Sequence, residues 1–379
     1  MKQTRIIISL LMTIFLPLMT LGQEAAEKFT IATLNVDGLP QKVLVVNLNV
    51  DGPGSAGTAR IGKYLMKKGY DMVLMQEDFN YHDVLTVMLE DDYKMDEWSG
   101  DVGVEGHSID FLHLQNFRFP CDGLMACWKN DLTVTPSNRT AWQQNFGKFS
   151  HANDEMVTKG FRRYDVTLRS GGRIIVYNMH MDATLDEDED EDNGQKDHDA
   201  RMAQWAQLKE DVLQNLGSCP IIITGDMNSF YGRDEVKREF IDAINDSGRG
   251  TVSDVWVELQ LGGVYPTSKV TYATAGNEAL DKILYINPAL GTMIKPVAYT
   301  IDKDDYLYDG KPLGDHFPVS ATFQFVERKM TGIEDVTSGS SQESELNIYT
   351  LDGVKVSRQV AKGIYIEQSG EKTSKRIMK

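Results

Sequence analysis

The stretch PIIITGDMN, residues 220–228, joins a short apolar run to two polar side chains. A run of isoleucines is typical of a buried β-strand. Side chains two residues apart on an extended segment point to the same face, so Asp226 and Asn228 can both reach one phosphate or one water. Other strand-like runs also end in polar residues, namely Asn35, Glu77, His180 and the pair Asp315 and His316. The sequence therefore predicts polar groups where several strands end.

Strands and helices are both expected along most of the chain. Strand-like runs occupy residues 29–34, 72–75, 124–128, 164–168, 173–178, 221–224, 282–286 and 319–325, and helical patterns occupy 58–68, 81–89, 198–216 and 234–245. This mixture in one compact length predicts an α/β or α+β sandwich in which helices cover sheets. Catalytic groups would then cluster where strand ends meet loops.

The length and the first residues indicate an exported protein with one large domain. The chain has 379 residues, 41% of them hydrophobic and 25% charged, which is an ordinary globular balance. Lys2 and Arg5 precede an apolar stretch at 6–19, which predicts a signal peptide over residues 1–22. We therefore expect a secreted, periplasmic or outer-surface protein of a bacterium, and a monomer.

The charge argues against general nucleic-acid binding. The net charge is -17, and phosphate backbones are captured by basic surfaces. Part of the excess lies in an unbroken acidic run at 186–192, which favours a solvated loop over a calcium site.

The chain has 3 cysteines, which cannot all pair with one another. A bridge between Cys121 and Cys127 is compatible with export, but Cys127 lies in an apolar strand pattern. Their spacing does not indicate a metal site.

The C-terminal residues predict a separate small unit. We expect a linker at 329–345 and a small β tail at 346–379, with strand patterns at 346–349 and 363–366 joined through Asp352 and Gly353. The tail resembles the sorting modules of exported proteins from Bacteroidetes-type bacteria. A plain β-hairpin appendage is the alternative.

The polar strand ends follow one another in an order that resembles the endonuclease/exonuclease/phosphatase superfamily of Mg²⁺-dependent phosphoesterases. The matching motifs are LN at 34–35, QE at 76–77, NMH at 178–180, GDMN at 225–228, LDKIL at 280–284 and DH at 315–316. The resemblance implies a DNase I-like α+β fold, a four-layer α/β/β/α sandwich, over residues 23–328. One departure is Gly314, where the family usually has serine.

Phosphodiester hydrolysis explains why these residue types are needed. The anionic oxygens repel a nucleophile, so the site needs a divalent cation, a positioned water and charge neutralisation in the transition state. Glu77 is the best candidate metal ligand, with Asn35 beside it. An oxygen-rich site of this kind suits Mg²⁺, with Mn²⁺ or Co²⁺ as substitutes. Asn35 is preferred to Asn49, which lies in a short echo of the same motif, because Asn35 ends the first strand pattern.

His316 is the candidate general base for the attacking water. Neighbouring side chains on an extended backbone diverge, so Asp281 is a better partner for His316 than Asp315 is, as the resemblance also implies. We assign alignment of the attacking water to Asp226. Asn228 and His180 would donate hydrogen bonds to the phosphoryl oxygens.

The segment DEMVTKGF at 154–161 narrows the expected substrate. It looks like the Asp-x4-Lys-Gly element of neutral sphingomyelinases, whose aspartate and lysine act near the active site; a salt-bridged loop is the alternative. Lys159 would meet a phosphate, or pair with Asp154 when idle. We therefore expect a secreted phosphodiesterase that cleaves sphingomyelin to ceramide and phosphocholine at a membrane surface. The alternatives are a nuclease, an inositol-phosphate phosphatase or a non-catalytic surface-binding module.

Overall fold

The computed structural model describes residues 27–43, 46–47, 49–100, 118–148, 151–183, 193–233, 235–267 and 278–326, with four tail segments at 346–349, 355–356, 363–369 and 372–378. The expected signal peptide, acidic run and linker lie outside these residues. The chain divides into two compact units, Met1–Val326 and Glu327–Lys379. None of the described helices combines the length and apolar character of a membrane-spanning segment.

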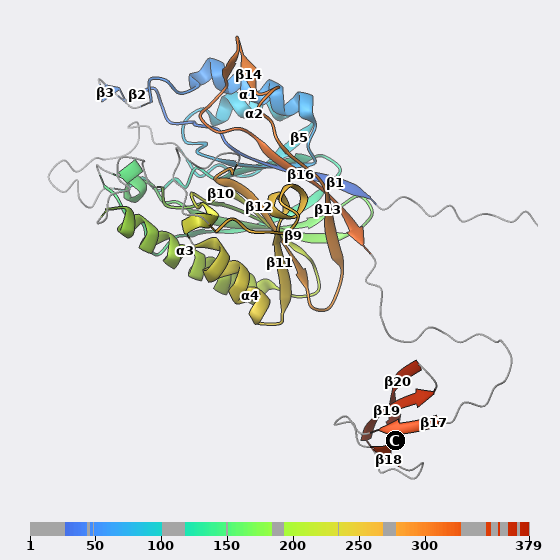
Figure 1. Ribbon diagram of the computed structural model, residues 1–379. Coiled ribbons are helices and arrows are strands. Elements are labelled where there is room, and N and C mark those ends of the chain that lie inside the picture. Colours follow the sequence, from blue (N-terminus) through green and yellow to red (C-terminus); the bar gives the residue numbers. More distant parts are fainter. Residues whose placement is uncertain are drawn as a thin grey trace, which may run out of the picture. The chain divides into compact units, whose positions relative to one another are not determined.

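Two six-stranded mixed sheets form the first unit (Figure 1). In the first sheet the strand order is β13 (Met293–Ile301), β16 (Val319–Val326), β1 (Lys28–Asn35), β4 (Met72–Gln76), β6 (Met125–Lys129) and β5 (Tyr93–Met95). In the second it is β11 (Gly250–Asp254), β12 (Asp281–Pro288), β10 (Ile221–Asp226), β9 (Arg173–His180), β8 (Gly160–Thr167) and β7 (Thr133–Ala141). One strand pair in each sheet is parallel, β1 with β4 and β9 with β10.

The sheets pack face to face, and β10 shows why its sequence is apolar throughout. Ile222 belongs to the core between the sheets, with Phe29 and Leu74 of the first sheet. Ile221 and Ile223 point the other way, into the core beneath the helices. A strand buried on both faces reads as a continuous apolar run.

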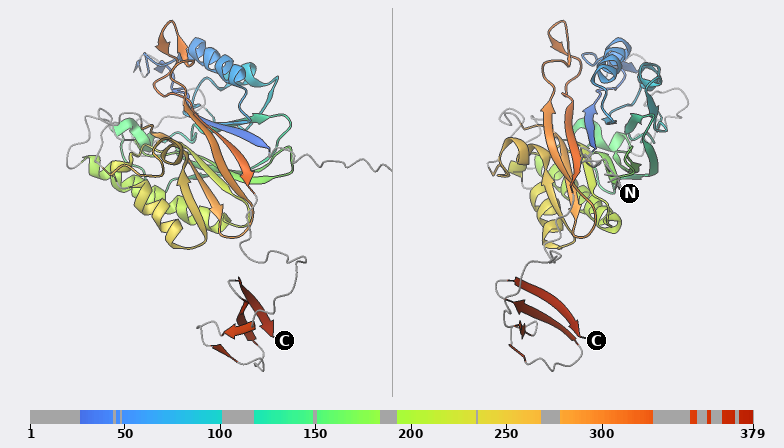
Figure 2. Two further views of the ribbon diagram at one scale, coloured as in Figure 1. Left: turned by 45° about the vertical axis from the view of Figure 1, so that its right-hand side comes forward. Right: turned by 90° about the vertical axis from the view of Figure 1, so that its right-hand side faces the viewer.

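Helices cover the outer face of each sheet (Figure 2). Over the first sheet lie α1 (Gly54–Lys68) and α2 (His82–Leu89), which contribute Ile61 and Leu85 to one core. Trp205 of α3 (Asn193–Asn215) and Phe240 of the π-helix η5 (Val236–Asp242) pack over the second sheet, with α4 (Ala243–Asp246) beyond them. The predicted four-layer α/β/β/α sandwich is therefore confirmed.

The expected strands and helices are all present, with bounds that differ by a few residues. Shorter elements complete the unit, namely the pairs β2 (Lys42–Val43) with β3 (Val46–Asn47) and β14 (Leu307–Tyr308) with β15 (Lys311–Pro312), helix α5 (Val255–Gln260), and the 3-10 turns η2 (His151–Met156) and η4 (Tyr231–Arg233). All three cysteines are free thiols, so Cys121 and Cys127 do not form a bridge.

The C-terminal unit holds a four-stranded sheet rather than a two-stranded hairpin. Its order is β18 (Lys355–Val356), β17 (Leu346–Tyr349), β19 (Gly363–Ser369) and β20 (Lys372–Met378). The two strands expected from the sequence, β17 and β19, pair antiparallel at its centre.

Candidate functional site

The inward-facing residues change from apolar to polar at one edge of the two sheets. Alternation along each strand places Asn35, His180, Asp226 and Asp281 on the same inner faces as the apolar core. The register then aligns them, because Asp226 is opposite His180 on one side and opposite Asp281 on the other. The polar strand ends predicted from the sequence are therefore brought together.

Asn35 connects the two sheets. Its Nδ2 donates to Glu77 Oε1 at 2.8 Å and to Asp226 Oδ2 at 3.2 Å. One layer deeper, Gln76 Nε2 donates to Asn178 Oδ1 at 2.7 Å across the same space. These buried amides set the spacing of the sheets at the site.

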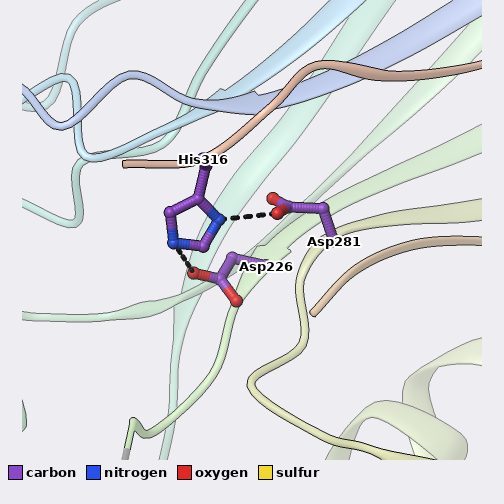
Figure 3. A group of neighbouring side chains, drawn as sticks. All are labelled: Asp226, Asp281 and His316. Atoms are coloured by element: carbon purple, nitrogen blue, oxygen red, sulfur yellow. Dashed lines mark hydrogen bonds and ion pairs between the residues drawn. The ribbon is translucent and has the colours of Figure 1, made fainter. Parts of the chain in front are cut away.

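His316 lies between two carboxylates (Figure 3). Its Nδ1 is 2.6 Å from Asp281 Oδ2, and its Nε2 is 3.7 Å from Asp226 Oδ2. Burial lowers the pKa of His316, but the charges of Asp281 and Asp226 outweigh it and raise that pKa well above its usual value. Asp281 therefore orients the imidazole and leaves Nε2 facing the site.

His180 is a neutral imidazole in the same cluster. Its Nε2 is 3.5 Å from Asp226 Oδ2 and 3.9 Å from Glu77 Oε1. Burial and the charges of Lys159 and His316 lower the pKa of His180 well below its usual value. Its Nδ1 is buried without a hydrogen-bond partner among the described residues.

Asp154 and Lys159 form a buried ion pair beside the strand ends. Lys159 Nζ is also 3.4 Å from the Met181 carbonyl, and Asp154 Oδ2 accepts from the Ala183 N–H at 2.9 Å. Burial raises the pKa of Glu77, and the charge of Lys159 opposes part of that rise. The segment is thus both a salt-bridged loop and a source of positive charge for the cluster.

Asn228 is tied to the backbone around the site. Its N–H donates to Asp226 Oδ1 at 3.1 Å, and its Nδ2 donates to the Met181 carbonyl at 3.1 Å.

The donor set fits a divalent cation. Among the described residues, Asp226, Asp281 and His316 have ligand atoms within 4.8 Å of one another. The predicted ligands Glu77 and Asn35 adjoin this group through the bonds given above. Burial raises the pKa of Glu77 to about 7 and also raises that of Asp226. The buried carboxylates that the structure describes here outnumber the nearby positive charges. A bound metal ion would therefore be stabilised, because it neutralises this excess negative charge.

Asp37 is a neighbour that the sequence reasoning did not select. Burial and the charge of Asp315 raise its pKa to about 6, and its Oδ1 accepts from Asn49 Nδ2 at 2.5 Å. The echo of the first motif therefore has a physical role, because Asn35 occupies the site while Asn49 supports Asp37 from outside.

Three of these residues have left-handed backbone conformations without being glycine. The φ angles are 50° at Asp37, 58° at Glu77 and 45° at Asn228. Such conformations are strained for residues with a side chain, and they concentrate at functional sites.

The architecture is similar to that of solved structures of other proteins. No family model matches the chain. A humanized TDP2 of D. rerio has a TM-score of 0.51 and 17% identity, over 78% of this chain and 99% of that chain. A truncated TDP2 of Caenorhabditis elegans has a TM-score of 0.50 and 14% identity, over 78% and 97%. These similarities show the fold, a DNase I-like α+β sandwich.

Curated proteins from two mycobacteria match most of the chain at modest identity. Proteins named sphingomyelinase from Mycobacterium tuberculosis and Mycobacterium bovis are 27% identical to the chain over 303 residues. The match covers 79% of this chain and 53% of the relative. The chain therefore spans about half the length of the curated relatives it matches.

Proposed function

We propose that this protein is an exported, Mg²⁺-dependent phosphodiesterase that hydrolyses sphingomyelin to ceramide and phosphocholine at a membrane surface. The observation that carries the proposal is the meeting of the His316–Asp281 pair with Asp226, Glu77 and Lys159 at one edge of the two sheets. The names of the curated relatives support the choice of lipid.

Glu77, with Asn35 beside it, would hold the divalent cation. When bound, the cation supplies charge neutralisation at a phosphoryl oxygen. Lys159 adds a fixed positive charge next to the same group, since its charge acts on both Glu77 and Asp226.

His316 and Asp226 are placed to prepare an attacking water. The distance of 3.7 Å between His316 Nε2 and Asp226 Oδ2 is longer than a direct hydrogen bond, so one water can contact both atoms. Because Asp281 takes the Nδ1 side of the ring, Nε2 is the atom that receives the proton of that water. Since Asp281 and Asp226 raise the pKa of His316, Nε2 accepts this proton only in molecules whose imidazole is neutral. His180 and Asn228 complete the site as donors to phosphoryl oxygens.

The acidic surface favours a zwitterionic headgroup over a polyanion. The net charge of -17 repels a nucleic-acid backbone. A phosphocholine headgroup carries its own cation, which an acidic surface does not repel.

Phosphocholine release tests the proposal. Purified protein is incubated with Mg²⁺ and vesicles of sphingomyelin or phosphatidylcholine, and in parallel with plasmid DNA and inositol phosphates. We expect sphingomyelin to be cleaved fastest and EDTA to stop the reaction. Nicking of DNA without hydrolysis of any choline lipid would assign the site to a nuclease.

The variant His316→Ala should lose activity by about 10²- to 10⁴-fold, as expected for a general base. A matched control is His198→Ala. His198 also contacts a carboxylate, with Nδ1 2.9 Å from Glu235 Oε1, but that pair lies outside the strand-end cluster. This control should retain activity.

A further inference from the structure

Tyr306 has a buried hydroxyl that the mechanism above does not use. The residue is 0% exposed, and its ring packs edge-on against Tyr64 at 5.0 Å between centroids. Its hydroxyl has no hydrogen-bond partner in the part of the chain that the structure describes. Unpaired buried hydroxyls are unfavourable, so this one calls for a partner.

The hydroxyl lies beside the acidic side of the site. A Cβ atom at Gly314 would lie 3.5 Å from the Tyr306 hydroxyl oxygen and 3.7 Å from Asp37 Cβ. Burial and then the charges of Asp315, Asp37 and Asp281 raise the pKa of Tyr306 well above its usual value. The group is therefore a protonated donor that faces carboxylates.

Tyr306 also contacts the turn that carries His316. Its carbonyl accepts from the Leu313 N–H at 3.3 Å, and its ring is 6.4 Å from that of Phe317. The two contacts flank Asp315 and His316 on both sides. A hydrogen bond from the hydroxyl to this turn would limit its motion.

Among the carboxylates whose charges raise the pKa of Tyr306, Asp315 has the largest effect after burial. Its side chain is exposed, and no hydrogen bond joins its carboxylate to another described residue. Rotation of this side chain toward Tyr306 therefore breaks no such bond. Gly314 has no side chain next to the Tyr306 hydroxyl, where a Cβ would make ordinary contacts.

We propose that Tyr306 is a positioning residue, whose hydroxyl donates to Asp315 when the site binds a phosphodiester and so holds the turn that places His316. This inference rests on the proposed function. It also predicts that a serine hydroxyl at position 314, next to Tyr306, can take over this role.

The variant Tyr306→Phe removes the hydroxyl and keeps the ring. A hydrogen bond to a charged group is strong enough for about a tenfold fall in kcat. We expect that fall with KM and the melting temperature nearly unchanged. The control Tyr64→Phe loses bonds to Asp302 (2.7 Å) and Tyr70 (3.1 Å), so it should lower the melting temperature and leave kcat intact.

Rescue separates positioning from packing. The backbone of Gly314 is not left-handed and a Cβ there makes ordinary contacts, so serine fits. Adding Gly314→Ser to Tyr306→Phe should restore most of the lost kcat. Wild-type kcat in Tyr306→Phe, or a loss that Gly314→Ser does not restore, would overturn the proposal.

NMR decides the question even if no lipid is hydrolysed. The His316 Nδ1 proton, in its 2.6 Å contact with Asp281, should appear at low field. With Mg²⁺ and phosphocholine as the probe, we expect this signal to broaden in Tyr306→Phe and to sharpen again with Gly314→Ser. An unchanged signal refutes the positioning role, whereas failure of the wild type to cleave any phosphodiester refutes only the proposed function.

Discussion

Arg201 and Glu235 form a buried ion pair beneath the site, and its removal has a calculable effect. Arg201 is 1% exposed and Glu235 is 0% exposed. Arg201 Nε lies 3.0 Å from both carboxylate oxygens, and Arg201 Nη2 lies 2.9 Å from Oε1. Glu235 Oε2 also accepts a hydrogen bond from Ser229 Oγ at 2.5 Å. Ser229 directly follows Asn228 in the chain, which links the ion pair to the site. We therefore consider the variant Arg201→Met, which keeps an apolar stem and removes the charge.

The expected loss in the free energy of unfolding follows from the pKa of Glu235. Burial raises this pKa, but Arg201 and the other donors outweigh it and lower the value from 4.5 to about 2. At 1.36 kcal/mol per pKa unit, this shift corresponds to roughly 3 kcal/mol of folding stability. Breaking a buried pair by removing one partner costs about 3–5 kcal/mol. We expect Arg201→Met to lower the free energy of unfolding by about 3–4 kcal/mol at pH 7.

The pH dependence gives a second signature. Because the folded pKa of Glu235 is depressed, its stabilising contribution is complete above the unfolded value near 4.5 and is lost as pH falls toward 2. In Arg201→Met, burial acts on Glu235 without its main counter-charge. Acidification should then protonate Glu235 without the same loss of stability.

Urea unfolding followed by circular dichroism between pH 7 and pH 3 measures both effects. Lys209→Met is a matched control on the same helix, because Lys209 pairs with Glu239 at 2.5 Å while both side chains are 25% exposed. A partly exposed pair of this kind contributes about 1 kcal/mol or less. If Arg201→Met costs no more than Lys209→Met, or keeps the wild-type acid slope, the reasoning is wrong.

Three further changes probe the site and its scaffold. Glu77→Gln should weaken Mg²⁺ binding at least about tenfold by calorimetry; unchanged affinity would place the cation elsewhere. Asp281→Asn, which leaves His316 poorly oriented, should lower kcat about 10²-fold in the phosphocholine assay with little change in KM; equal kcat would contradict the orienting role. Gly225→Ala should lower the melting temperature far more than Gly171→Ala. Both glycines have a positive φ (145° and 82°), but only a Cβ at Gly225 would meet a backbone oxygen, that of Met179, at 1.9 Å. Equal losses of melting temperature would mean that backbone strain alone decides the effect.

Local patterns predicted the central strands and their polar ends because those strands are buried on both faces. The edge strands were not predicted, since they do not have this pattern. In β7, polar residues and a register shift between Pro136 and Arg139 interrupt the alternation. In β13, a shift between Pro296 and Ala298 does the same. Exposed edges need no continuous apolar run, so periodicity carries little signal there.

The site was partly predictable for a similar reason. Polar residues at strand ends stand out against apolar runs, which singled out Asp226 and His180. Contacts between distant segments left no such signal. Asn35 meets Asp226 across 191 positions of sequence only because two inner faces pack together. The contacts of the Tyr306 hydroxyl and of the Arg201–Glu235 pair likewise depend on packing, and none of these three residues stands in a recognisable motif.

The left-handed backbone at Asp37, Glu77 and Asn228 lowers the stability of the fold at positions whose side chains the site needs for turnover. Glycine adopts this conformation without strain, so glycine at any of the three positions would relieve on the order of 1 kcal/mol of backbone strain while deleting a side chain of the site. Selection for heat resistance alone should therefore enrich glycine at these positions. Selection that also demands hydrolysis should retain the strained residues, and the scaffold would have to gain its tolerance to heat elsewhere.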